Sequence, residues 1–361
     1  FTGMFNSIFR AFEKMDYQSL GQILSSILML SGVIVAIKQG FDVIGFASLY
    51  LIASIIALGY SFVVLRWKFA NPTFVEPPWK IKIDWSFWKP TIKEALPFGL
   101  TGISVIIDFQ IDSVMLSLMK GNEVVGWYNA AYKLIFVLMV IPSVFVTSIF
   151  PVMSRHFKSA KNLLNQEYQI AFKYLFIIAL ILFIYGLIFA DKIILIIYGD
   201  GYLPSIKALQ VLIWVIPIIF LTSLFGNFLA AVDKQRVVAA VAGANAGLNV
   251  ILNMLLIPKC SYIGASTATV LTESLGFILM GSYISKHILK ISISQNIVKP
   301  FCSGILTAIL IYFLKQQIHW ILAAVLGVFI YISLLFIFHI ISKNDIRLVK
   351  QGILGGNNYG K

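Results

Sequence analysis

The chain has 361 residues, of which 59% are apolar and 12% charged, and its 28 Lys and Arg exceed its 15 Asp and Glu by 13. The charged fraction is about half that of a soluble domain, so the composition excludes an ordinary soluble globule and a disordered protein. The four histidines and two cysteines are scattered and match no metal-binding or redox motif. We therefore expect no metal and no cofactor.

Ten apolar stretches are long enough to cross a bilayer core of roughly 30 Å as helices. We predict them at residues 20–38, 43–65, 95–119, 125–150, 170–190, 206–231, 237–257, 262–285, 297–314 and 319–341. The expected fold class is therefore all-α, a polytopic membrane protein with about ten transmembrane helices.

Residues 1–19, ahead of these stretches, have apolar positions at helical spacing. This pattern fits either the end of a further helix or an amphipathic helix on the membrane surface. The chain starts at Phe1 and has no signal-peptide pattern, so we expect it to begin part-way through a fold.

The basic residues predict an orientation in the membrane. Alternate connections hold 21 of the 28 Lys and Arg, the other connections hold six, and Lys133 lies inside a span. Because cytoplasmic connections are enriched in Lys and Arg, we expect a cell-membrane protein with both chain ends in the cytoplasm. The positive charge then reflects topology and contact with anionic membrane lipids, and we expect no nucleic-acid partner.

The longest connection, residues 66–94, is cytoplasmic by the same rule. It contains prolines, which interrupt regular structure, and tryptophans of the kind found at membrane interfaces. These residues are Pro72, Pro77, Pro78, Trp67, Trp79, Trp85 and Trp88. We predict a linker between two helical lobes at residues 67–94.

Ionisable side chains inside membrane spans cost free energy and are therefore candidates for function. The span 95–119 carries Asp108 and Asp112, which share one helical face with Thr101 and Ser104. We expect this polar stripe to line water or a polar cavity, with Asp108 the stronger candidate for function.

The next span, 125–150, carries Lys133, with Asn129 and Tyr132 beside it. Asp112 and Lys133 each lie seven residues from the outer end of their span, so antiparallel neighbours would hold them at one depth. We predict an Asp112–Lys133 ion pair, which acts either as a structural bridge or in transport.

Polar residues in two later spans complete the set of candidates. Glu273 lies near the centre of the span 262–285 and is either a cavity-lining, proton-carrying group or a packed acid. The span 237–257 has asparagines at every fourth position: Asn245, Asn249 and Asn253. Such amides pack membrane helices or line a cavity, and packing is the favoured interpretation.

Three stretches of the sequence resemble a known family. The first reads FRAFEKM at residues 9–15, followed by Tyr17-Gln18 and Gly21-Gln22. The second runs from LPFG at 96–99 through Asp108 and Asp112 to GWYNAAYKL at 126–134 and Phe150-Pro151. The third contains Asn249, Asn253, Ile257-Pro258, Gly264-Ala265-Ser266, Ala268-Thr269 and Glu273. Together they resemble the Wzx-type polysaccharide-biosynthesis flippases of the MOP transporter superfamily, to which MATE and MurJ proteins are related.

The resemblance implies a two-lobed helical bundle around a central cavity. Residues 1–66 would be the end of an incomplete first lobe, 95–290 a complete six-helix lobe, 296–342 an additional helix pair and 343–361 a cytoplasmic tail. The implied function is translocation of lipid-linked oligosaccharide units to the outer leaflet for surface polysaccharide biosynthesis, by alternating access. The implied partners are this substrate, membrane lipids and glycan polymerase or transferase machinery, and both undecaprenyl and dolichyl carriers remain open.

Two other functions remain open. A cation-coupled drug or metabolite antiporter of the MATE type would also use buried acids. A membrane glycan polymerase or ligase is disfavoured because the outer connections are short and poor in Arg. No nucleotide-binding, metalloprotease or serine-hydrolase motif occurs, so we predict that the protein is not an enzyme.

Overall fold

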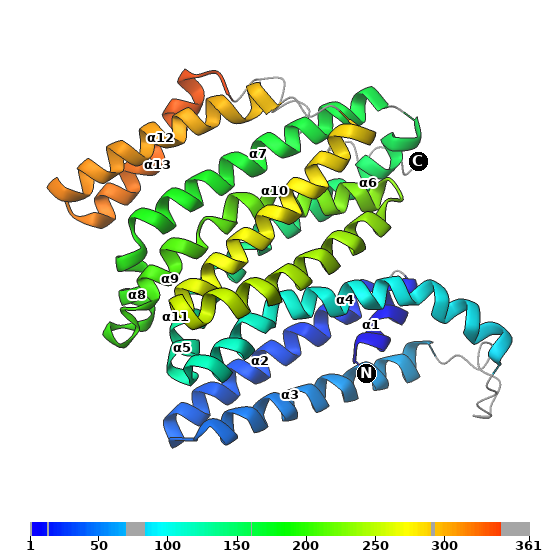
Figure 1. Ribbon diagram of the computed structural model, residues 1–361. Coiled ribbons are helices and arrows are strands. Elements are labelled where there is room, and N and C mark those ends of the chain that lie inside the picture. The colour runs from blue at the N-terminus through cyan, green and yellow to red at the C-terminus, as the bar shows by residue number, and fades with distance from the viewer. Residues whose placement is uncertain (1, 13, 70–83, 160, 290–292, 341–361) are drawn as a thin grey trace. The chain divides into compact units, whose positions relative to one another are not determined.

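The computed structural model describes residues 2–12, 14–69, 84–159, 161–289 and 293–340. Within these ranges the regular structure is entirely helical (Figure 1). The chain divides into two compact units, Phe1–Asp84 and Trp85–Lys361. Each unit is described by itself below.

The first unit is a helical hairpin with one short helix packed on it. It comprises α1 (Thr2–Ala11), α2 (Met15–Gln39), α3 (Val43–Val64) and the short π-helix η1 (Leu65–Phe69). The turn between α2 and α3 uses Gly40 at φ 68°, a conformation that favours glycine. Asp42 then caps α3 by accepting a hydrogen bond from the Gly45 N–H at 2.9 Å. Helix α1 contacts both arms and buries Phe9.

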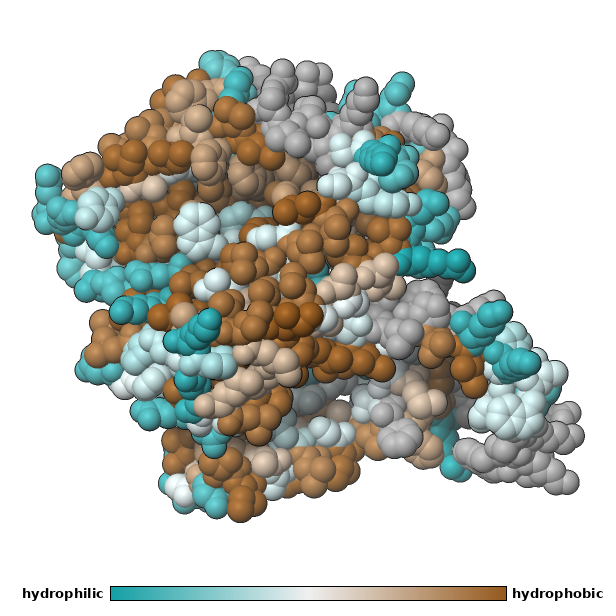
Figure 2. Space-filling view, in the orientation of Figure 1, coloured by the Kyte–Doolittle hydropathy of each residue, from teal (hydrophilic) through white to brown (hydrophobic). Residues whose placement is uncertain are grey.

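The second unit contains the remaining helices. They are α4 (Trp85–Lys120), α5 (Asn122–Leu138), α6 (Val140–Ser159), α7 (Lys161–Ile188), α8 (Ala190–Tyr198), η2 (Asp200–Tyr202), α9 (Ser205–Leu212), α10 (Val215–Ala231), α11 (Gln235–His287), α12 (Ile293–Gln317) and α13 (Trp320–Ile337). Aromatic rings from α7 and α10 form part of its core, where Tyr168 lies against Phe225 and Phe228. Apolar side chains, brown in Figure 2, also cover much of the surface in view, as expected of a protein solvated by lipid.

Helix α11 is a hairpin of two antiparallel arms. Its 53 residues would extend about 80 Å as one straight helix, more than twice the thickness of a bilayer core. The chain instead reverses near Ser261, which has φ 53° and ψ −135°. A Cβ on Gly264 would lie 2.4 Å from the carbonyl oxygen of Leu256, so the two arms meet directly after the turn.

These helices account for the ten predicted spans. Among the described residues, eight helices are long and apolar enough to cross a membrane, and the pair α9 and α10, bent by 42°, makes a ninth. Counting the two arms of α11 separately gives ten. The fold class predicted from sequence is therefore confirmed.

Two predicted boundaries differ from the structure. Helix α4 begins at Trp85, so residues 85–94 are helical and are not part of a linker. Hydropathy identifies only the apolar segment that crosses the bilayer, whereas α4 extends beyond that segment into polar sequence. The predicted span 125–150 is confirmed as one candidate span, Asn122–Phe150, but it consists of two helices, α5 and α6, divided at Met139. Pro142 explains the break, because proline has no N–H to continue the helical ladder one turn back. Most of the linker, residues 70–83, and the tail 343–361 lie outside the described residues.

Helices α12 and α13 are attached to α7 at both ends. Lys315 on α12 donates to the carbonyl of Ile188 at 3.0 Å, and Lys173 on α7 donates to the carbonyl of Ile340 at 3.1 Å. Between them, the Tyr331 hydroxyl donates to the carbonyl of Ile177 at 3.0 Å. Because these bonds use main-chain acceptors at widely spaced levels, the pair packs along the length of α7 (Figure 1).

We predict that Gly264→Ala destabilises the α11 hairpin. The new Cβ would meet main-chain atoms at 2.4 Å, and overpacking of this kind costs about 1–3 kcal/mol. Gly247→Ala in the same helix is the matched control, because nothing lies within 4 Å of its Cβ position. The thermal midpoint of detergent-solubilised protein should fall for the first variant and hold or rise for the second. Equal midpoints would contradict this account of the turn.

Candidate functional site

Asp112 is the centre of a buried hydrogen-bond network in the second unit. Its side chain on α4 is 1% exposed. One carboxyl oxygen accepts bonds from the Tyr128 hydroxyl at 2.5 Å and the Thr269 hydroxyl at 2.8 Å. The other oxygen accepts a bond from the Asn253 amide at 2.5 Å, and the same amide also donates to Asn249 at 2.6 Å. The network joins α4, α5 and both arms of α11.

Helical periodicity explains why these side chains meet. Residues four apart lie on one helical face, and three such sets face one another. They are Asp108 and Asp112 on α4; Asn245, Asn249 and Asn253 on the first arm of α11; and Thr269 and Glu273 on the second arm. Asp112 meets Asn253 and Thr269. One turn further along their helices, Asp108 and Glu273 border a cavity, which Asn245, two turns from Asn253, also lines. The sequence thus builds two polar layers, one helical turn or more apart.

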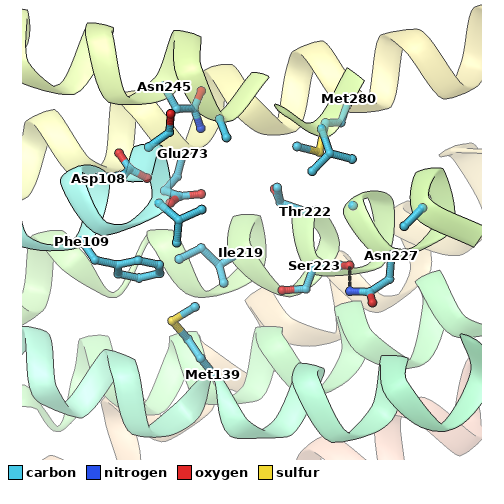
Figure 3. A pocket seen from close by; sticks show the side chains of 16 residues that line it. Asp108, Phe109, Met139, Ile219, Thr222, Ser223, Asn227, Asn245, Glu273 and Met280 are labelled. Atoms are coloured by element: carbon cyan, nitrogen blue, oxygen red, sulfur yellow. Dashed lines mark hydrogen bonds between the residues drawn. The ribbon is translucent and has the colours of Figure 1, made fainter. Parts of the chain in front are cut away.

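The layer around Asp108 lines a cavity of about 410 Å³ (Figure 3). This volume falls within the range of small-molecule sites. Asp108, Asn245 and Glu273 lie at one end of the cavity, and the α10 residues Thr222, Ser223 and Asn227 lie toward the other. All the lining residues belong to the second unit.

The carboxyl groups that line this cavity are free, unlike that of Asp112. Among the described residues, neither Asp108 nor Glu273 forms an ion pair or a hydrogen bond. Asn245 is 7% exposed, and its amide oxygen has no partner. A buried polar group without a partner costs free energy, which a suitable ligand would recover.

The remaining wall of the cavity is apolar. Phe109, Met139, Ile219 and Met280 line it together with short side chains of α10 and α11. Phe109 is held in place by edge-to-face contacts with Tyr132 and Phe136, with ring centroids 6.5 and 6.3 Å apart. The site therefore combines a few convergent polar groups with an apolar surface, as binding pockets generally do.

The predicted Asp112–Lys133 ion pair does not form. All of the groups bonded to Asp112 are uncharged, and Lys133 is exposed. The reason is rotation about the helix axis. Tyr128 and Tyr132 stack on one face of α5, and Lys133, the next residue, points about 100° away.

Two other candidates pack α5 onto α4 and do not line the cavity. Asn129 accepts a hydrogen bond from the Ser113 hydroxyl at 2.9 Å. Tyr132 lies between Tyr128 and Phe109. The roles of these residues, as of Asp108, Asp112, Glu273 and the asparagines, stay predictions.

Tyr128 was missed as a site residue. It is fully buried and donates the short bond to Asp112. Its spacing of four from Tyr132 was available in the sequence, but nothing there distinguishes a tyrosine bonded to an acid from one that only packs.

The described residues contain no group of three His, Cys, Asp or Glu side chains placed to hold a metal ion. What the two layers offer is a fixed polar network and, beside it, carboxyl and amide groups open to a ligand.

Comparison with known proteins supports a relation to membrane flippases. Residues 1–157 match a family model described as Polysaccharide biosynthesis protein, and residues 97–255 match the MatE model. The chain is 24% identical over 324 residues to an uncharacterized membrane protein of Methanocaldococcus jannaschii. The alignment covers 87% of this chain and 62% of that protein. It is 24% identical over 288 residues to the probable low-salt glycan biosynthesis flippase Agl15 of Haloferax volcanii, covering 74% of this chain and 61% of the relative. The chain thus spans slightly less than two thirds of the length of these curated relatives.

Two solved structures share the fold. The lipid II flippase MurJ, in an inward closed conformation, aligns with a TM-score of 0.77 at 17% identity, over 94% of this chain and 70% of its own. An outward-facing multidrug resistance transporter of the MATE family aligns with a TM-score of 0.55 at 18% identity, over 79% of this chain and 66% of its own. With the sequence matches, these make the chain similar to membrane flippases and transporters of the MOP superfamily. Within it, the chain is similar to the polysaccharide-biosynthesis flippases.

We predict that Asp112→Ala destabilises the protein more than Asp108→Ala. The first variant leaves buried donors without an acceptor, which costs about 1–3 kcal/mol for each group, whereas Asp108 has no partner to lose. Asp112→Asn keeps one acceptor oxygen and should fall between them. Lys133→Met should have no effect on stability, since no ion pair exists. Thermal midpoints in detergent give the order, and equal losses at positions 108 and 112 would contradict it.

Proposed function

We propose that the protein translocates lipid-linked oligosaccharide units from the cytoplasmic to the outer leaflet. The observation that carries this proposal is the cavity with unpartnered Asp108, Asn245 and Glu273, set among membrane-spanning helices of a flippase-superfamily fold. A polar cavity inside the bilayer can hold a sugar unit while the lipid tail stays among lipid chains.

The polysaccharide-biosynthesis match and the glycan flippase relative support an oligosaccharide as the cargo. We propose alternating access as the mechanism, coupled to a proton or sodium gradient through Asp108 or Glu273. These carboxyl groups suit that role because they face the cavity and are not engaged by other side chains.

A drug or metabolite antiporter is the second candidate. It is favoured by one observation: the described lining residues of the cavity include two acids and no basic residue. Such a cavity would attract an organic cation. The match to the MatE model is compatible with this alternative.

We also propose that the protein resides in the cell membrane with its ends in the cytoplasm and works beside glycan polymerase or transferase machinery. The alternation of Lys and Arg along the connections supports the orientation.

Deleting the full-length gene should make lipid-linked oligosaccharide accumulate in the cytoplasmic leaflet, because its route outward is lost. Wild-type protein should restore the distribution, and Asp108→Ala should not. The surface variant Asp191→Asn, whose carboxyl group is bonded to Lys192 away from the cavity, should restore it. The measurement is enzymatic accessibility of the glycan in each leaflet.

An unchanged distribution with intact surface glycan would argue for the antiporter, and export of cationic dyes on a pH step would then be tested.

Ion coupling is tested in the same leaflet assay. If Asp108→Asn and Glu273→Gln both keep full transport with unchanged pH and sodium dependence, the proposal that these acids couple transport to an ion gradient is wrong.

The two cysteines test the orientation. Cys260 lies at the tip of the α11 hairpin, in a connection predicted to be outside, and Cys302 lies near the cytoplasmic end of α12; both are exposed. A membrane-impermeant maleimide added to intact cells should label the wild type and Cys302→Ser, but not Cys260→Ser. Labelling of Cys260 only after the membrane is permeabilised would reverse the orientation.

A further inference from the structure

The charge of the cavity lining carries information about its ligand. Asp108 and Glu273 lie near each other at one end (Figure 3), and the described residues that line the cavity include no Lys, Arg or His. Binding sites are usually complementary in charge to what they bind. A carboxylate or phosphate placed here would meet two acids and no compensating cation.

The carboxyl groups of Asp108 and Glu273, unlike that of Asp112, are available to accept hydrogen bonds from a ligand. Asp112 has its oxygens occupied by three donors, whereas the oxygens of Asp108 and Glu273 have none among the described residues. Each carboxyl group can accept bonds from hydroxyl or amino groups of a ligand. Asn245, more than nine-tenths buried and without a partner for its amide oxygen, adds a group that both donates and accepts.

The apolar lining near these acids suits the less polar face of a sugar ring. Phe109 presents an aromatic side chain there, with Met139 and Ile219 beside it. The polar end and this wall together match a compact group that carries several hydrogen-bond donors and one apolar face.

We infer that this cavity binds a neutral or amino-bearing sugar unit and excludes sugars that carry a carboxylate or phosphate. The inference rests on the proposed function and specifies its substrate class. It follows that the anionic pyrophosphate of the carrier is bound by groups outside this cavity.

Two carriers that differ in one group test the inference: a polyprenyl pyrophosphate bearing a single glucose, and the same lipid bearing a single glucuronic acid. Full-length protein is reconstituted in liposomes, and translocation of each is followed with a glycan-modifying enzyme outside. We expect glucose to move at least about tenfold faster, because the carboxylate of glucuronic acid would lie beside two acids with no cation among the described lining residues. In the Asp108→Asn, Glu273→Gln double variant the ratio should fall below about threefold.

The ratio compares two substrates in one preparation, so incomplete folding of a variant cancels. If the double variant does not turn over, equilibrium binding of both lipids to protein in nanodiscs gives the same ratio without transport. Asp191→Asn, which removes a carboxylate outside the cavity, should keep the wild-type preference.

Equal transport of both lipids by the wild type would overturn the inference and leave the flippase function standing. An unchanged preference in the double variant would overturn it too. If wild-type protein moves neither lipid, the proposed flippase function fails and this inference fails with it.

Discussion

The second unit depends on the burial of one carboxyl group. Asp112 is 1% exposed within a helix bundle, where an acid without partners would strongly disfavour folding. Its partners come from α5 and both arms of α11, so the bonds can form only when these helices have the correct rotation and depth. A buried network that is satisfied in one arrangement specifies that arrangement. It also fixes the height of Asp108, one helical turn along α4, relative to Glu273 and Asn245.

The chain therefore uses similar residues for two purposes. Asp112, which accepts bonds from three donors, joins helices to one another. Asp108 and Glu273, which have no donors among the described residues, face a cavity. The same holds for the asparagines: Asn253 donates to Asp112, while Asn245 borders the open space. Polar groups that bond the helices together and polar groups that face the cavity thus lie in neighbouring layers of the same helices.

The membrane-spanning helices could be predicted because the bilayer imposes their length and the loops carry alternating charge. Spacings of four identified Asp108, Asp112, Asn245 and Glu273 as polar positions on common faces. The sequence could not tell which acid has partners, because that depends on the rotation of α5 and α11 about their axes. For the same reason depth alone suggested Lys133 as the partner of Asp112, whereas Tyr128 holds that place. The start of α4 at Trp85 was missed because an interfacial helix has no apolar signature.

Gly276, on the second arm of α11, leaves space for the Asn245 side chain at the polar end of the cavity. A Cβ at position 276 would lie 2.5 Å from the Asn245 amide nitrogen, so the glycine leaves the room that the amide occupies. A larger side chain at 276 would displace the Asn245 amide, and a smaller side chain at 245 would leave a void beside the cavity. The two positions, 31 apart in sequence, are therefore coupled through one contact. A substitution at position 276 would reshape this end of the cavity through the Asn245 side chain, although Gly276 is not itself one of the described lining residues.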